Sequence, residues 1–138
     1  MTAVDTHILE RFYCDDPEDI EAKRQRPVAR RLMVESASLF VPLTVLLEFE
    51  WVMRGFYRAS TEEFCQATEH LLGMAPVTVE RWEAVADAIN LHRRGLDFVD
   101  ALHWAGSSAC SELVTFDDKG FMRRAQRLDL SPAVVLAA

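Results

Sequence analysis

The sequence has little cysteine and no long apolar run, and both absences narrow the class of protein. Its 138 residues include three cysteines, widely spaced and without a CxxC motif: Cys14, Cys65 and Cys110. This spacing fits neither a disulfide framework nor a zinc site, so we expect free thiols in a reducing cytosol. No apolar stretch reaches the roughly 20 residues of a membrane span, and no signal peptide is recognisable. We therefore expect a cytoplasmic protein that makes no contact with a membrane.

The chain also lacks net positive charge. A formal charge of −7 argues against a protein that is held on nucleic acid by bulk electrostatics. A nuclease is still compatible with this charge, because carboxylates that hold a metal ion add negative charge of their own. Half of the residues are hydrophobic, which excludes disorder as the main state. No repeat or low-complexity segment interrupts the chain, and we expect one domain over residues 1–138.

Short apolar segments alternate with segments of helical periodicity. This order predicts an α/β fold in three layers, with a central, mostly parallel sheet of four to five short strands flanked by helices. The strands are expected at residues 1–5, 38–41, 112–116 and 132–136, with a connection or short strand at 76–79. The helices are expected at residues 6–12, 20–35, 43–57, 60–72, 78–94, 97–105 and 119–128. The second of them is expected to start within 15–19, with Pro17 in its first turn, and to kink or break at Pro27.

The segment from Gly95 to Ala105 places two carboxylates inside an otherwise apolar helix. Asp97 and Asp100 lie three residues apart and share one helix face with Trp104. Asp97 fits the helix cap, after Gly95 has ended the preceding helix. A cap does not account for Asp100, which needs a partner from elsewhere in the chain.

Glu48 raises the same question in the apolar helix predicted from Leu43. Its neighbour Glu50 has Arg54 four residues further on, which is the spacing of an ion pair. No base lies at helical spacing from Glu48, so we expect it to be an interior carboxylate with a distant partner.

Two further acids follow predicted strands. Asp5 and Asp117 each lie where a strand turns into a helix, and in open parallel sheets such turns carry the functional sites. Either acid also suits a helix N-cap, and for Asp5 the cap is the simpler interpretation of its own segment. If all four acids meet, they cannot stay ionised without a cation. Oxygen ligands alone favour Mg²⁺ or Mn²⁺ over zinc.

Four segments, in order along nearly the whole chain, carry a family resemblance. They are Ala3–Thr6, Val41–Glu48 followed by Trp51-Val52, Leu96–His103, and Val114–Asp117. Together they resemble the PIN domain family, and within it the VapC toxins of bacterial type II toxin–antitoxin pairs. The resemblance implies a Mg²⁺- or Mn²⁺-dependent endoribonuclease that forms a homodimer and is inhibited by a cognate VapB-type antitoxin.

The resemblance also assigns site residues. The family's acid quartet corresponds to Asp5, Glu48, Asp100 and Asp117, which would hold one or two metal ions that activate water against the scissile phosphate. Neighbours expected to support these ligands are Thr6, His7, Asp97 and Thr115. His7 departs from the family, which often has asparagine or serine there; it either hydrogen-bonds a ligand or protrudes at the surface.

Basic residues are the candidates for RNA contacts, and a purely structural role remains open for each candidate. The most basic stretch supplies Arg24, Arg26, Arg30 and Arg31, which are either RNA contacts or a solvated helix face. His103 is expected to pack as a buried residue beside Trp104 and not to act as a general base. The aromatic residues Phe12, Trp51, Phe56 and Tyr57 form either a groove for the antitoxin or, for most of them, core.

Two other functions are compatible with the sequence. One is a catalytically inactive PIN-fold module that acts only by binding protein partners, which His7 favours and four retained acids oppose. The other is a phosphatase with an aspartyl nucleophile, which would want a second acid at the position of His7.

Overall fold

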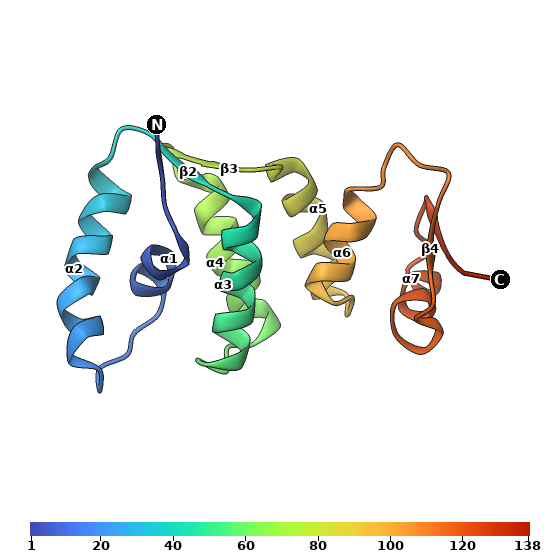
Figure 1. Cartoon of the computed structure of the whole chain (residues 1–138), viewed down its shortest axis with the longest axis horizontal. Coiled ribbons are helices and arrows are strands. Elements are labelled where there is room, and N and C mark those ends of the chain that lie inside the picture. Colours follow the sequence, from blue (N-terminus) through green and yellow to red (C-terminus); the bar gives the residue numbers. More distant parts are fainter. The chain divides into compact units, whose positions relative to one another are not determined.

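The chain forms two compact units, and the computed structural model describes all of residues 1–138 (Figure 1). The first unit is Met1–Trp82 and the second is Glu83–Ala138. Helices alternate with short parallel strands in both units, which confirms the predicted α/β class. No helix combines the length and the apolar character needed to cross a membrane.

The first unit is built on a three-stranded parallel sheet in the order β1-β2-β3. Leu39 pairs with Thr2 on one side and with Val77 on the other, so β2 is the central strand. Leu39 and Val41 are fully buried, as expected for a strand with neighbours on both edges. The elements are β1 (Thr2–Ala3), α1 (Thr6–Tyr13), α2 (Ile20–Glu35), β2 (Leu39–Val41), α3 (Leu43–Gly55), α4 (Thr61–Gly73) and β3 (Val77–Val79).

The start of α2 differs from the prediction. The helix begins at Ile20 and not at Pro17, because the Asp19 carboxylate accepts hydrogen bonds from the backbone amides of Glu21 and Ala22. Pro27 does not split the helix. Pro27 has no backbone amide hydrogen, so the carbonyl of Lys23 lacks its usual partner in the helix. Both residues are exposed, and water can bond this carbonyl instead.

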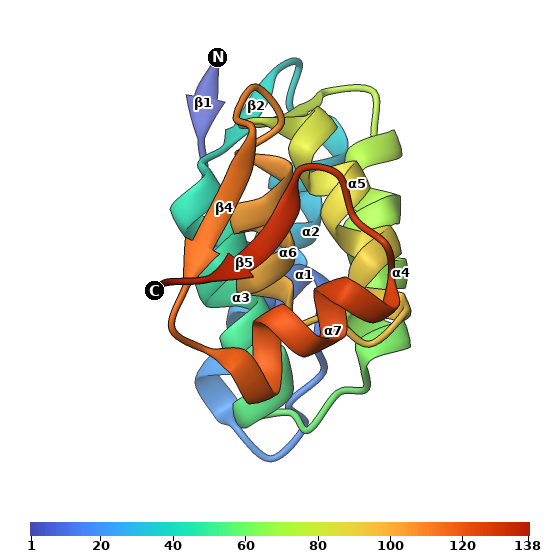
Figure 2. The same cartoon turned by 90° about the vertical axis from the view of Figure 1, so that its right-hand side faces the viewer.

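The second unit contains a two-stranded parallel sheet, with β4 and β5 side by side (Figure 2). Their register runs from Glu112 opposite Ala133 to Thr115 opposite Leu136. All five strands of the chain are therefore in parallel pairs, as predicted, but they form two sheets where one central sheet was expected. The elements are α5 (Trp82–Arg93), α6 (Phe98–Ala105), β4 (Glu112–Thr115), the π-helical turn η1 (Asp118–Met122), α7 (Arg123–Arg127) and β5 (Ala133–Leu136).

Gly95 ends α5 and sets the entry into α6. Its φ of 104° lies in the left-handed region that only glycine adopts without strain. The Gly95 amide bonds to the His92 carbonyl and the Leu96 amide to that of Leu91, which closes the last turn. The predicted stop at Gly95 is thus confirmed, and Asp97 lies directly before α6.

Candidate functional site

Asp5 follows strand β1 and caps helix α1. Its Oδ1 accepts a hydrogen bond from the His7 backbone amide at 3.1 Å, so the predicted cap is present. The His7 Nδ1 lies 3.9 Å from the other carboxylate oxygen of Asp5. Both side chains are largely exposed, at 74% for His7 and 71% for Asp5. The Asp5 carboxylate therefore caps the helix and still faces solvent.

Glu48 is joined to the segment of Asp5 by Thr6. The Thr6 hydroxyl, which is buried, donates a hydrogen bond to the Glu48 carboxylate. The prediction of an interior Glu48 is wrong, because its side chain is exposed. The prediction of a distant partner is right, because Thr6 lies 42 residues away in sequence.

Glu50 is the carboxylate that α3 buries. It is 4% exposed, and its Oε2 lies 2.9 Å from Nε of Arg54, which confirms the predicted ion pair. The buried residues of this helix, Leu46, Phe49, Glu50 and Met53, follow helical spacing. This face turns Glu48 outward, where it can bond a ligand without the cost of burying a charge.

A second acidic group lies in the second unit, around Asp100. The pKa of Asp100 is raised above its ordinary value of 3.8, mostly because the side chain is half-buried. The charges of Asp97 and Asp117 raise this pKa further, while His103 and Arg124 lower it. The start of α6 and the end of β4 thus bring like charges together, so a cation there would favour the ionised form of Asp100.

Asp97 stands at the N-cap position of α6, but its side chain makes no capping hydrogen bond. The predicted position is therefore confirmed, and the predicted cap interaction is not present. An exposed carboxylate that bonds no backbone amide is available to a cation or to water.

Asp117 is held by the turn that follows β4. Its backbone amide donates to Thr115 Oγ1 at 3.0 Å, and its Oδ1 accepts from the Gly120 amide at 2.8 Å. This confirms the predicted cap at the start of the next helical segment. The role of Gly120 was not apparent from the sequence. A Cβ there would lie 2.6 Å from Asp117 Oδ2, so glycine leaves the space that this carboxylate occupies.

His103 is exposed, so the prediction that it packs as a buried residue is wrong. The residues that α6 buries are Phe98, Ala101, Leu102 and Ala105. Trp104 is half-buried, and its Nε1 donates to the Pro132 carbonyl at 3.0 Å, which ties α6 to the segment that enters β5.

Asp5 and Glu48 belong to the first unit, and Asp100 and Asp117 to the second. Nowhere in residues 1–138 do three or more His, Cys, Asp or Glu side chains meet in an arrangement that could hold a metal ion. Mg²⁺ commonly takes only one or two protein carboxylates and completes its shell with water and substrate phosphate. The oxygen-only donors and the like charges around Asp100 fit such a hard cation.

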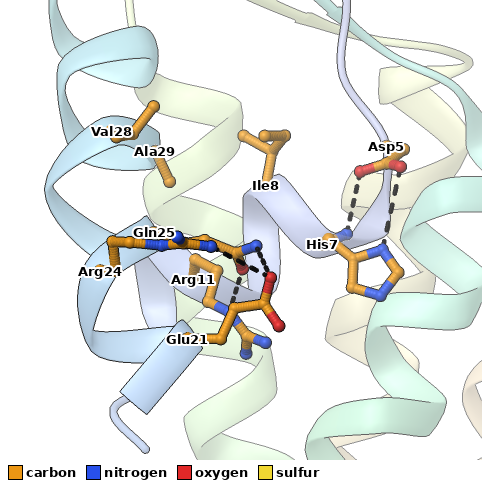
Figure 3. Close-up of a pocket in the computed structure, with 9 residues that line it drawn as sticks. All are labelled: Asp5, His7, Ile8, Arg11, Glu21, Arg24, Gln25, Val28 and Ala29. Atoms are coloured by element: carbon orange, nitrogen blue, oxygen red, sulfur yellow. Dashed lines mark hydrogen bonds and ion pairs between the residues drawn. The ribbon is translucent and has the colours of Figure 1, made fainter. Parts of the chain in front are cut away.

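A pocket of about 710 Å³ lies beside Asp5, between helices α1 and α2 (Figure 3). Asp5 and His7 are at one side of it, and Arg24 and Gln25 of α2 face it from the other. This pocket is not apparent from the sequence, because its walls come from two helices whose packing depends on tertiary contacts. Its remaining lining residues are Ile8, Arg11, Glu21, Val28 and Ala29.

The basic residues of α2 differ in their surroundings. Arg26 is half-buried and bonded to Asp15 at 2.7 Å, so it already has a partner. Arg24, Arg30 and Arg31 are exposed. Of the four arginines predicted to contact RNA, only Arg24 lines the pocket beside Asp5.

Two aromatic residues of the α3 segment lie at the surface. Trp51 is 64% exposed and Phe56 is 67% exposed, so of the two alternatives, groove or core, the core does not hold for this pair. Phe12 and Tyr57 are half-buried, and the Tyr57 hydroxyl donates to Glu10 at 2.9 Å.

No protein-family model matches this chain, and no curated protein is significantly similar to it. The resemblance to PIN domains therefore remains a prediction that is carried by the four sequence segments.

Proposed function

We propose that this chain is a Mg²⁺- or Mn²⁺-dependent endoribonuclease with a PIN-domain fold, acting as a VapC-type toxin. Asp5, Glu48, Asp100 and Asp117 are the catalytic acids in this proposal, as the family resemblance assigns them. The observation that carries it is the half-buried position of Asp100, whose pKa is raised by burial and then by the charges of Asp97 and Asp117, without an ion pair to any of these carboxylates. Like-charged carboxylates of this kind are stabilised by a divalent cation.

The residues around the acids have separate tasks. Asp100 and Asp5 are assigned to bind the metal, and Glu48 and Asp117 to bind it or to orient water around it. Thr6 fixes one oxygen of Glu48, and the Gly120 amide fixes Oδ1 of Asp117. A bound Mg²⁺ or Mn²⁺ would make water a stronger nucleophile and neutralise charge on the phosphate.

Cleavage of mixed bacterial RNA by the purified protein tests the proposal. We expect cleavage with Mg²⁺ or Mn²⁺, none with EDTA, and a loss in Asp100→Ala and in Asp5→Ala. The matched control is Asp87→Ala, which removes an exposed acid from α5 and should cut normally. Cleavage that survives EDTA or Asp100→Ala would overturn the proposal.

A double variant tests whether both acidic groups serve one centre. The effects of residues that act as a unit are strongly non-additive, so a shared centre predicts that Asp5→Ala combined with Asp100→Ala is no slower than either single variant. Independent, multiplicative losses would instead show that the two groups act separately.

The toxin role adds partners to the proposal: an RNA substrate, a cognate VapB-type antitoxin and a second copy of the chain. The exposed aromatic side chains of Trp51 and Phe56 support a protein partner, since such residues are enriched in interfaces. Expression of the chain alone should arrest bacterial growth, and Asp100→Ala should relieve the arrest. Sedimentation velocity tests the dimer. Growth arrest by the Asp100→Ala protein would favour a binding module over a nuclease.

A further inference from the structure

The pocket between α1 and α2 has the size and lining of a ligand site. Its volume of about 710 Å³ falls within the range of small-molecule pockets. Ile8, Val28 and Ala29 form an apolar wall, and charged or polar side chains surround it (Figure 3). Because Asp5 is one of its lining residues, whatever fills the pocket lies next to a proposed metal ligand.

The polar end of the pocket is fixed by hydrogen bonds. Gln25 Oε1 accepts from Arg11 Nε at 2.9 Å, and Gln25 Nε2 donates to Glu21 at 3.3 Å. Arg11 is held in turn by Glu10, with Nη1 to Oε1 at 3.1 Å. A side-chain network that is already ordered loses little entropy when a ligand binds.

Arg24 is the movable cation of this pocket. Its Nη2 atom lies 3.4 Å from Oε1 of Glu21. Both side chains are mostly exposed, at 77% for Arg24 and 63% for Glu21. Exposed ion pairs of this kind contribute little stability, so Arg24 can exchange Glu21 for a phosphate oxygen at small cost.

We propose that this pocket binds one nucleotide of single-stranded RNA next to the phosphate that is cleaved. The inference rests on the proposed nuclease function through Asp5. The base packs against Ile8 and Val28, and the His7 ring covers it from the side of Asp5. Arg24 binds the phosphate of the same nucleotide. The strand is single, because a base must be unstacked to enter a pocket.

His7 gives the pocket an aromatic ring on which a base can stack. Its imidazole is exposed and lies at the rim, where an aromatic ring can stack on a base. A smaller side chain at this position would leave the base without that contact. His7 therefore biases the pocket toward bases that stack strongly, and the acids cut the strand that is held there.

An acidic peptide fits the pocket less well than RNA. An acidic side chain has no apolar group to place on the wall of Ile8, Val28 and Ala29, whereas a nucleotide combines a flat base for that wall with a phosphate for Arg24.

A larger side chain that fills the pocket should weaken RNA binding, and this tests the proposal. The probe is a short, fluorescein-labelled, single-stranded RNA of random sequence, followed by anisotropy with the Asp100→Ala chain so that it is not cut. Val28→Trp should weaken binding about tenfold, the size of one lost base contact. The matched control is Val34→Trp on the same helix, since Val28 is 59% exposed and Val34 is 61% exposed. Equal binding by the two tryptophan variants would overturn the proposal.

A second pair separates the pocket from general electrostatics, and keeps the test decisive if a tryptophan variant folds poorly. Arg24→Gln and Arg31→Gln remove the same charge from exposed positions of α2. If the pocket binds RNA, Arg24→Gln should weaken RNA binding clearly more than Arg31→Gln does. Equal losses would mean that the helix attracts RNA only by charge, which contradicts the proposal.

Cleavage mapping with His7→Asn distinguishes this inference from the proposed function. Among the cuts that the variant makes, the preference for the nucleotide beside the cut should differ from that of the wild type. If the wild type cuts and neither RNA binding nor preference responds to the pocket variants, the pocket inference alone fails. If the pocket variants weaken RNA binding but no variant or wild type cuts, the nuclease proposal fails and the RNA subsite stands.

Discussion

Gly120 stands where a side chain would displace the carboxylate of Asp117. An added Cβ would lie 2.6 Å from Oδ2 and 2.8 Å from Oδ1 of Asp117, while the Gly120 amide donates to Oδ1. The glycine thus both holds this carboxylate and leaves room for it. Because the obstructed atoms are the end of a flexible side chain, a larger residue moves the carboxylate more readily than it disturbs the fold.

The first prediction follows from this contact. Gly120→Ala should lower RNA cleavage about 10- to 100-fold, the usual cost of disturbing the support of a ligand. The midpoint of thermal unfolding should change little. Initial cleavage rates and a thermal scan of the same preparation measure both effects.

Gly73→Ala is the control for that variant. Its added Cβ would meet no atom within 4 Å, so both cleavage and thermal stability should be kept. Full activity in Gly120→Ala would show that the position of the Asp117 carboxylate does not matter for cleavage, and would count against its assigned role.

Local signals in the sequence predicted several boundaries correctly. Helix α4 begins and ends within one residue of the predicted range 60–72, and Ser60 and Glu63 form a capping box at its start, with hydrogen bonds of 2.9 and 3.1 Å. Gly95 and Asp117 also end and start elements as predicted. These features depend on a few neighbouring residues, so the sequence carries them directly.

The orientation of α3 could not be predicted in the same way. The helix is apolar nearly all round, so its periodicity does not show which face is buried. The sequence pattern predicts an interior Glu48 and an ion-paired Glu50, whereas the structure buries Glu50 and exposes Glu48. The same ambiguity leaves groove and core open for Trp51. Packing against α1 and α4 decides the orientation, and such contacts join residues far apart in sequence.

The candidate site was partly visible in the sequence. Asp5 and Asp117 were predicted as acids that follow strands, and the structure places both there. The Thr6–Glu48 hydrogen bond, the room left by Gly120 and the pocket beside Asp5 were not predicted, because each depends on tertiary distances.

The second prediction concerns Thr6. Thr6→Val keeps the shape of the side chain but removes the hydroxyl that orients Glu48. Cleavage should fall about 10-fold, as for the loss of other groups that orient a ligand. The free energy of unfolding should fall by only about 1 kcal/mol, since the exposed Glu48 can bond water instead. Urea unfolding and cleavage rates check the two effects, and Thr44→Val, at an exposed position of the same helix as Glu48, should change neither.

The third prediction is a pH dependence of stability in metal-free buffer. The folded chain raises the pKa of Asp100, chiefly by burial and then through Asp97, so it binds the proton more tightly than the unfolded chain does. The contribution of Asp100 to the free energy of unfolding is therefore highest below the ordinary pKa of 3.8. This contribution falls as the pH rises through the pKa of Asp100 in the folded chain. Asp100→Asn should raise the unfolding midpoint at neutral pH and have no such benefit below about pH 3.

Urea unfolding at several pH values, with EDTA present, measures this effect. The control Asp87→Asn removes one charge from an exposed position of α5. If Asp100→Asn raises the free energy of unfolding by the same amount at all pH values, titration of Asp100 is excluded as the cause. Added Mg²⁺ should stabilise the wild type and not Asp100→Asn, because only the former keeps the charge that attracts it.

The last prediction uses the three free cysteines to check the packing of both units. Cys14 and Cys65 are buried in the first unit, whereas Cys110 is exposed in the second. Burial, followed by the charge of Glu10, raises the pKa of the Cys14 thiol to about 11, so almost no reactive thiolate forms at neutral pH. Ellman's reagent should therefore modify Cys110 rapidly in the native protein and the other two only after unfolding. Cys110→Ser should abolish the fast phase, and a fast phase of more than one thiol would contradict the packing of α1 against its neighbours.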